Sequence, residues 1–147
     1  LVAADESIRK AEDPLRVAAA GSADVVVVKV APLGGVRRAL DVAEACGLPV
    51  VVSSALDTGV GIAAGIALAA ALPDLPFACG LGTVALFERD VAADLVRPAL
   101  GALSTSALPV EPDAELLAQL AAPAERQQWW RDRLARCYDV LNRTAAP

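Results

Sequence analysis

Apolar residues along the first hundred positions gather in short, dense runs that are separated by longer helix-like segments. Four runs predict strands, over 1–5, 25–30, 49–53 and 76–83. Three longer segments predict helices, from Pro14 up to Gly21, over 35–46 and over 59–72. The later strands start near 24, 49 and 76, about one βα unit apart. Because valine-rich strands alternating with helices are typical of a parallel sheet covered by helices, the pattern predicts an α/β fold.

The residues at the helix ends and on the helix faces add detail to this prediction. Asp13 fits an N-cap, with Pro14 at the first helical position. The helix over 35–46 is expected to bury one face, formed by Val36, Leu40 and Ala43. The helix over 59–72 is apolar on all sides and ends before Pro73, which predicts that it is buried.

The alternation of strands and helices stops near residue 100. A connector over 101–112 precedes two predicted helices, over 113–120 and 123–143. Four residues of the longer helix recur at i, i+4, i+7 and i+11 and form an apolar stripe: Trp130, Leu134, Cys137 and Leu141. Such a stripe predicts either core or a domain interface.

The pattern by itself leaves two parallel architectures open, an open sheet and part of a (β/α)8 barrel. A complete barrel needs about 250 residues. The chain has 147 residues, so it could hold about half of such a barrel.

Composition and charge exclude several classes of function. The net charge of −5, with acidic and basic residues interspersed, gives no footprint for nucleic acid. The apolar run over 59–72 has 14 residues and includes three glycines, whereas a membrane span needs about 20, so no membrane role is expected. Histidine is absent, which excludes imidazole-based catalysis and His-ligated metals. Three widely spaced cysteines in apolar surroundings predict packing roles and a reducing, cytoplasmic location.

Candidate chemistry follows the predicted strands, because working residues of parallel α/β proteins gather at the carboxyl ends of the strands. These ends carry acids, an amine, hydroxyls and bare backbone, namely Asp5, Glu6, Lys29, Ser53, Ser54, Asp57, Gly80 and Gly82. The set suits a small anionic substrate handled with a metal ion. Simpler interpretations stay open: Asp5 as a turn cap, Lys29 extending into water from an edge strand, and the two serines as helix caps.

Four segments, in order and at matching spacings, resemble strands five to eight of an enolase-superfamily barrel: ADES, VVVVKVAPLGG, VVSSALDTGVG and CGLGT. Within the superfamily they are most similar to the o-succinylbenzoate synthase family of the actinobacterial type. The resemblance extends over nearly the whole chain. It implies that residues 1–104 are the second half of a TIM-type barrel. Residues 105–147 would be a connector and helices that return toward a capping domain absent from the chain.

The resemblance also implies a reaction and roles for individual residues. The family carries out Mg²⁺-dependent syn-dehydration of 2-succinyl-6-hydroxy-2,4-cyclohexadiene-1-carboxylate to 2-succinylbenzoate in menaquinone biosynthesis. Asp5 matches a ligand of the essential Mg²⁺, for which Mn²⁺ is a substitute, and Lys29 matches the catalytic lysine whose charge stabilises the enediolate. Ser53, Ser54 and Gly80 match substrate-binding positions, and Asp57 matches a supporting acid.

The remaining metal ligands, a second-strand lysine pair and the capping domain lie, in the family, upstream of residue 1. The expected partners are therefore the upstream half of the barrel, the capping domain and a small anionic carboxylate substrate, and the isolated chain is expected to be inactive. N-acylamino acid racemase and dipeptide epimerase of the same superfamily are alternatives. Epimerases carry Asp-x-Asp where this chain has Gly80-Leu81-Gly82, which argues against a cationic substrate end. A further alternative is a non-catalytic half-barrel that self-associates as a homo-oligomer.

Overall fold

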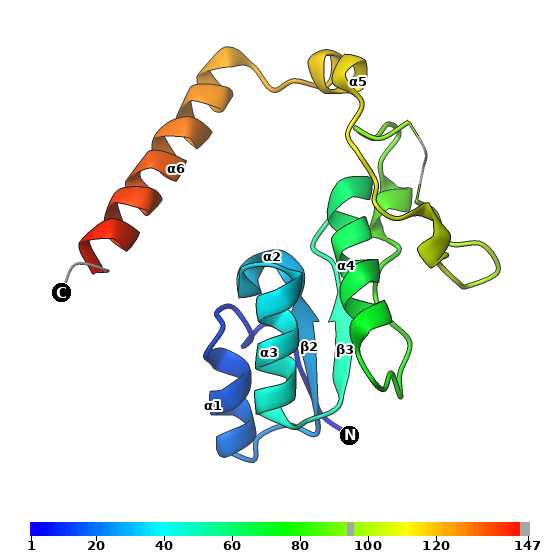
Figure 1. Cartoon of the computed structure of the whole chain (residues 1–147), viewed down its shortest axis with the longest axis vertical. Helices are drawn as coiled ribbons and strands as arrows, with labels where there is room; N and C mark the ends of the chain where they lie inside the picture. The colour runs from blue at the N-terminus through cyan, green and yellow to red at the C-terminus, as the bar shows by residue number, and fades with distance from the viewer. Residues whose placement is uncertain (94–95, 145–147) are drawn as a thin grey trace.

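A computed structural model describes residues 1–93 and 96–144, and its centre is a three-stranded parallel sheet in the order β1-β2-β3 (Figure 1). The strands are β1 (Ala3–Ala4), β2 (Val25–Lys29) and β3 (Val50–Ser53). Ala3 pairs with Val25, and Val26 pairs with Val50. Because the strands are parallel and neighbours in sequence, their carboxyl ends meet at one edge of the sheet, as the alternating pattern predicts.

Helices connect these strands and cover the sheet. They are α1 (Asp13–Ala19), α2 (Val30–Leu33), α3 (Val36–Cys46) and α4 (Gly59–Ala71). Figure 1 shows α1, α3 and α4 lying along the strands, with α3 in contact with both α1 and α4. The short α2 was not expected from the pattern, which continued the strand to Val30. This helix ends at Leu33, and the chain turns into α3 through Gly34 and Gly35, whose positive φ values of 91° and 112° favour glycine.

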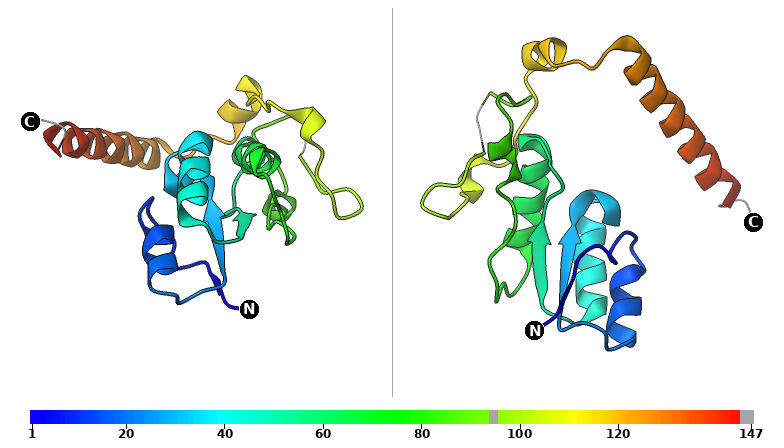
Figure 2. Two further views of the ribbon diagram at one scale, coloured as in Figure 1. Left: turned by 60° about the horizontal axis from the view of Figure 1, so that its bottom comes forward. Right: turned by 180° about the vertical axis from the view of Figure 1, so that it is seen from behind.

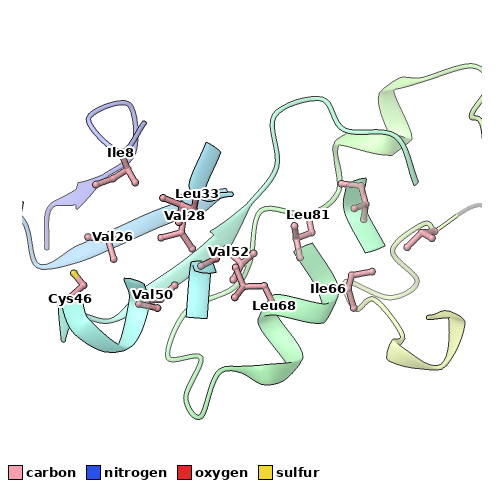
Figure 3. Close-up of a cluster of buried hydrophobic side chains, with 14 of the residues drawn as sticks. Ile8, Val26, Val28, Leu33, Cys46, Val50, Val52, Ile66, Leu68 and Leu81 are labelled. Carbon is pink, nitrogen blue, oxygen red and sulfur yellow. The ribbon is translucent and has the colours of Figure 1, made fainter. Parts of the chain in front are cut away.

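Valine side chains of β2 and β3 form the centre of the core (Figure 3). Val26, Val28 and Val52 are each 0% exposed. The core is completed from the helices and loops by a further set of apolar residues: Ile8, Leu33, Ala39, Cys46, Ile62, Ile66, Leu68, Leu81, Val84 and Val96. The core valines are at alternate positions, and Val27 and Val51 on the opposite face of the sheet are only half-buried. The complete burial on both faces that a continuous valine run predicts is therefore not reached in this chain.

The apolar helix α4 is buried along much of its length, as predicted. The buried face of α3 is rotated from the predicted one. Its buried residues are Ala39, Val42, Ala43 and Cys46, whereas Val36 and Leu40 are half-buried at the edge of the core. The small side chains of Ala39 and Ala43 lie at the centre of this face, and α3 contacts α4 closely.

The fourth predicted strand, over 76–83, is not a strand. Only Gly80 pairs there, in a single parallel bridge with Ser53, and a 3-10 helix, η1 (Thr83–Leu86), follows. The Gly80 amide donates to the Val52 carbonyl at 2.8 Å, and its carbonyl accepts from the Ser54 amide at 3.1 Å. Proline and glycine weaken the segment as a strand, so it contributes one residue to the sheet edge.

The predicted N-cap of α1 is also wrong by one residue. Asp13 is the first residue of the helix, and Glu12 occupies the capping position without a side-chain cap. The Asp13 carboxylate instead accepts hydrogen bonds from the backbone amides of Arg9 and Lys10, each at 2.8 Å. It therefore fastens the loop that follows β1 to the beginning of α1.

The C-terminal part contains a 3-10 helix, η2 (Thr105–Ala107), and the helices α5 (Ala114–Gln119) and α6 (Ala124–Thr144). Asp113 caps α5, with its carboxylate accepting from the Glu115 and Leu116 amides. Figures 1 and 2 show α6 projecting away from the sheet and its helices. No helix in the described part of the chain is long and apolar enough to cross a membrane.

The apolar stripe on α6 is not core within this chain. Trp130, Leu134 and Leu141 are 56%, 72% and 65% exposed. The cysteines differ in the same way: Cys46 packs in the core as expected and Cys79 is half-buried, whereas Cys137 is exposed, which contradicts its predicted packing role. The interface interpretation of the stripe, and the division of the chain near residue 104, stay predictions.

Candidate functional site at the carboxyl ends of the strands

The carboxyl edge of the sheet brings together four of the predicted site residues. Lys29 is the last residue of β2 and pairs in register with Ser53, the last residue of β3. Ser53 in turn bridges Gly80, which occupies the place of a fourth strand. Asp5 follows directly after β1, which pairs with β2 on its other side. Parallel pairing thus aligns an acid, an amine, a hydroxyl and a bare backbone position along one edge.

Lys29 and Asp5 form an ion pair, in which the Lys29 ammonium donates to a carboxylate oxygen of Asp5. The Lys29 side chain is 18% exposed and that of Asp5 is 43% exposed. Lys29 therefore does not extend from an edge strand into water. Asp5 is not merely a turn cap either, since its carboxylate points to the neighbouring strand while its carbonyl accepts from the Ile8 amide.

The two serines after β3 make different contacts. Ser54 is buried, and its hydroxyl contacts the Gly80 carbonyl at 3.0 Å and the Thr83 hydroxyl at 2.8 Å. Ser53 is half-buried and makes a longer contact of 3.4 Å with the same carbonyl. A Cβ on Gly80 would lie 2.9 Å from the Ser53 hydroxyl oxygen, so glycine allows the two segments to approach. Ser54 thus fastens the Gly80 segment to β3, and Ser53 has more hydrogen-bonding capacity left for a ligand.

Asp57 lies in the loop between β3 and α4 and stabilises that loop locally. Its carboxylate accepts from the Ala55 amide at 3.2 Å, and its side chain lies against Gly61 in the first turn of α4. Leu56, between Ala55 and Asp57, has a φ of 54°, a left-handed conformation that costs free energy for a residue with a Cβ. The loop is therefore held in a shape that its own backbone does not prefer.

The loop after Asp5 is organised by Asp13. Hydrogen bonds from the Arg9 and Lys10 amides lower the pKa of the Asp13 carboxyl below its ordinary value, and the positive charges of Arg16 and Lys10 act in the same direction. The buried side chain of Ile8 anchors the middle of this loop in the core. Together these contacts restrict the path by which the chain leaves Asp5.

Two residues at this edge were not identified from the sequence. Thr83 belongs to the CGLGT segment and contacts Ser54. Asp90 is 5% exposed, and its carboxylate accepts from the Gly59 amide at the start of α4. Asp90 stands in a charged stretch that resembles a surface loop, and hydrogen bonding across 31 positions has no local sequence signal.

Asp5 fits a divalent metal ion as one ligand of several. Carboxylate oxygens are the ligands that Mg²⁺ prefers, and Mg²⁺ sites commonly combine one or two protein carboxylates with water and substrate oxygens. Within residues 1–93 and 96–144, no group of three or more Asp, Glu, Cys or His residues could hold a metal ion. Asp5 as a metal ligand therefore stays a prediction.

Parallel strands that alternate with helices and carry polar residues at their carboxyl ends are the arrangement found in a segment of a TIM-type barrel. The family model described as "Enolase C-terminal domain-like" matches residues 1–115, and the chain belongs to this family. The predicted fold class, an α/β fold that forms part of a TIM-type barrel, is confirmed.

Curated relatives include the o-succinylbenzoate synthase of Mycolicibacterium smegmatis, which is 57% identical over 140 residues, and that of Mycobacterium tuberculosis, which is 56% identical. These matches cover 95% of this chain and 43% and 42% of the relatives, so the chain spans less than half of their length. Among solved structures, a muconate lactonizing enzyme from Pseudomonas putida matches with a TM-score of 0.73 and 27% identity. That match covers 82% of this chain and 35% of the enzyme. Another, from Pseudomonas fluorescens and complexed with muconolactone, has a TM-score of 0.71 and 31% identity over 80% of this chain and 33% of the enzyme.

Proposed function

We propose that this chain supplies the second half of the active site of an o-succinylbenzoate synthase. The observation that carries the proposal is the enclosed Lys29 ammonium beside Asp5 at the carboxyl edge of the sheet. The identity of 57% to an enzyme of that name, over nearly the whole chain, supports the assignment. The substrate would be the small carboxylate 2-succinyl-6-hydroxy-2,4-cyclohexadiene-1-carboxylate, and the products would be 2-succinylbenzoate and water.

The reaction requires that negative charge be stabilised while it develops on the substrate. Removal of the proton next to the carboxylate produces a doubly negative enediolate. The C–O bond to the hydroxyl then breaks as a general acid delivers a proton to the departing oxygen, which yields the aromatic ring and water. Lys29 stabilises this charge by its ammonium, whose side chain is 18% exposed and held at the end of β2. A group that removes the proton would come from the residues upstream of this chain.

The other residues of the edge bind and orient the substrate. Ser53 and Ser54 would contact its succinyl carboxylate, with the freer Ser53 hydroxyl as the main donor, and Gly80 would supply a backbone contact beside them. Asp57 would keep the loop after β3 in place. Asp5 would hold the divalent ion, which members of the superfamily use and which in this enzyme would be Mg²⁺ or Mn²⁺. When bound, the ion supplies positive charge at the substrate carboxylate.

The Gly80 segment, which lies beside β3 in the place of a fourth strand, does not support the epimerase alternative. Gly80 and Gly82 carry no acid there, and Leu81 between them is buried against α4. A substrate ammonium would therefore meet no carboxylate at this point.

A chimeric enzyme tests the proposal directly. The matching 43% of the Mycolicibacterium smegmatis enzyme would be replaced by this chain, and dehydration would be followed by the ultraviolet absorption of the aromatic product. We expect Mg²⁺-dependent turnover by the chimera and none by the 147-residue chain alone. A folded chimera without turnover would contradict the proposed function, and turnover by the chain alone would contradict the division of the site between two parts.

A further inference from the structure

We propose that Asp90 is a positioning residue that holds the loop between β3 and α4 in the shape required for substrate binding. This inference rests on the proposed function for its link to the substrate. The loop, residues 54–58, carries Ser54 and Asp57 and follows directly after Ser53. Asp90 lies outside every segment that the sequence connected with chemistry.

The contacts of the Asp90 carboxylate use both of its oxygens. One oxygen accepts from the Gly59 amide at 2.7 Å, and the other accepts from the Val91 amide at 2.7 Å. Asp90 is 5% exposed, so water contributes little to satisfying these groups. A buried carboxylate is costly unless it is hydrogen-bonded, and here the two amides satisfy it.

Asp90 takes the place of a local helix cap. Thr58 occupies the N-cap position of α4, but its side chain makes no capping hydrogen bond. A carboxylate at this end also interacts favourably with the helix dipole. The first turn of α4 is therefore stabilised by a residue 31 positions later, and the helix end is already occupied by an internal anion.

Gly59 matches this contact in shape. A Cβ at Gly59 would lie 2.5 Å from the Asp90 carboxylate oxygen, a distance that real side chains essentially never show. Its backbone φ is not in the left-handed region, so the absence of a side chain, rather than backbone freedom, makes glycine suitable there. The two residues fit as a pair.

The loop between the two anchors needs such support. At its beginning, Ser54 is fastened to Gly80 and Thr83. At its end, Gly59 is fastened to Asp90. Leu56 between them has a positive φ of 54°, a backbone conformation that is unfavourable for a residue with a Cβ and persists only where the surroundings hold it.

Asp90 also links this loop to the C-terminal part of the chain. The carbonyl of the next residue, Val91, accepts from the amide of Asp113 at 2.8 Å, and Asp113 is the N-cap of α5. The segment from Asp90 to Val91 thus connects the start of α4 with the start of α5.

The test compares Asp90→Ala and Asp90→Asn with Asp74→Ala, an exposed aspartate as the matched control, in the chimeric enzyme. Asparagine offers one oxygen where two amides need acceptors, so it should not replace aspartate. We expect amide hydrogen exchange over residues 54–62 to become at least about tenfold faster in the Asp90 variants. We also expect KM for the dehydration substrate to rise about 10-fold to 100-fold while kcat changes less.

The split between KM and kcat separates positioning from a purely structural role. Loss of folded protein would lower the apparent kcat and leave KM unchanged, and that result would overturn the proposal. Unchanged exchange over 54–62 would overturn it as well. If the chimera without these substitutions has no activity, the proposed function fails, and hydrogen exchange still decides whether Asp90 holds the loop.

A second variant approaches the contact from the other side, in case Asp90→Ala does not fold. Gly59→Ala should accelerate exchange over the same residues, because its Cβ would collide with the carboxylate. In the Asp90→Ala background, Gly59→Ala should accelerate exchange less than it does in the unmodified chain. The carboxylate no longer obstructs the new Cβ, and the Ala92 Cβ lies 3.6 Å away from it. Strict additivity of the two changes would contradict the contact.

Discussion

Lys29 and Asp5, separated by 24 positions in the sequence, form an ion pair at the carboxyl ends of the adjacent parallel strands β1 and β2. The lysine side chain is the more enclosed of the two. In this chain the acid partly neutralises the charge that the proposed reaction would use. A divalent ion bound at Asp5 would leave the Lys29 ammonium free to act on the substrate.

The first prediction concerns the only two lysines of the chain. In the chimeric enzyme, Lys29→Ala should lower kcat by about 10²–10³-fold, the loss that follows removal of one group that stabilises developing charge. Lys10→Ala is the matched control, because Lys10 is exposed and its backbone contact with Asp13 is kept. Steady-state kinetics decides the question, and equal activity of the two variants would contradict the role of Lys29.

Substitution of Asp5 tests its role as a metal ligand. Asp5→Asn removes a negative charge from the site, so the chimera should need at least about 10–100-fold more Mg²⁺ for half-maximal activity. Titration with Mg²⁺ and with Mn²⁺ measures this shift. Asp24→Asn is the control, because Asp24 directly precedes β2 and its carboxylate contacts the Val2 amide just before β1. An unchanged Mg²⁺ requirement in Asp5→Asn would remove Asp5 from the metal site.

The two serines after β3 should respond differently to replacement by alanine. Ser54→Ala leaves the Thr83 hydroxyl without its Ser54 partner and removes one of the donors to the Gly80 carbonyl, so the free energy of unfolding should fall by about 1–3 kcal/mol. Ser53→Ala removes only a long contact and should change stability by less than about 0.5 kcal/mol, while raising KM in the chimera. Denaturant unfolding and steady-state kinetics distinguish the two effects, and the reverse order of stabilities would contradict this assignment.

Asp13 should make the stability of the chain depend on pH in the acid range. Its pKa is lowered in the folded chain, mainly by the Arg9 amide and then by the Lys10 amide, so the folded state favours the ionised carboxylate. The stabilisation is therefore complete above the ordinary pKa of an aspartate and is lost as the pH falls through the lower folded-state pKa. Thermal unfolding between pH 7 and pH 3 should show a smaller loss for Asp13→Asn than for the unmodified chain. The exposed Asp41→Asn is the control, and it should retain the full pH dependence.

Much of the sheet and of its polar edge could be predicted from residue patterns. The valine runs placed β2 and β3, and the position of Lys29 at the end of a buried strand placed it at the mouth of the site. These features are local, since a run of β-branched apolar residues favours a strand whatever the rest of the chain does. The apolar composition of α4 likewise indicated a buried helix, which the structure confirms.

Other features depended on contacts between distant residues. The segment around Gly80 looked like a strand, but pairing with Ser53 limits it to one bridge. Asp13 looked like a helix cap, yet its carboxylate bonds to amides before the helix. The stripe of α6 has the spacing of a buried face, and yet it is exposed because the helix projects away from the sheet (Figure 2).

The sequence by itself determined the alternation of β1, β2 and β3 with α1, α3 and α4, the polar residues that follow these strands and the family resemblance, because each of these depends on neighbouring residues. Only the tertiary structure decided that Lys29 pairs with Asp5, that Ser54 fastens Gly80, and that Asp90 caps α4. Those pairings join residues 24 to 31 positions apart. Their partners are selected by the way the strands and loops pack together, and a hydrogen bond formed on folding leaves no local pattern in the chain.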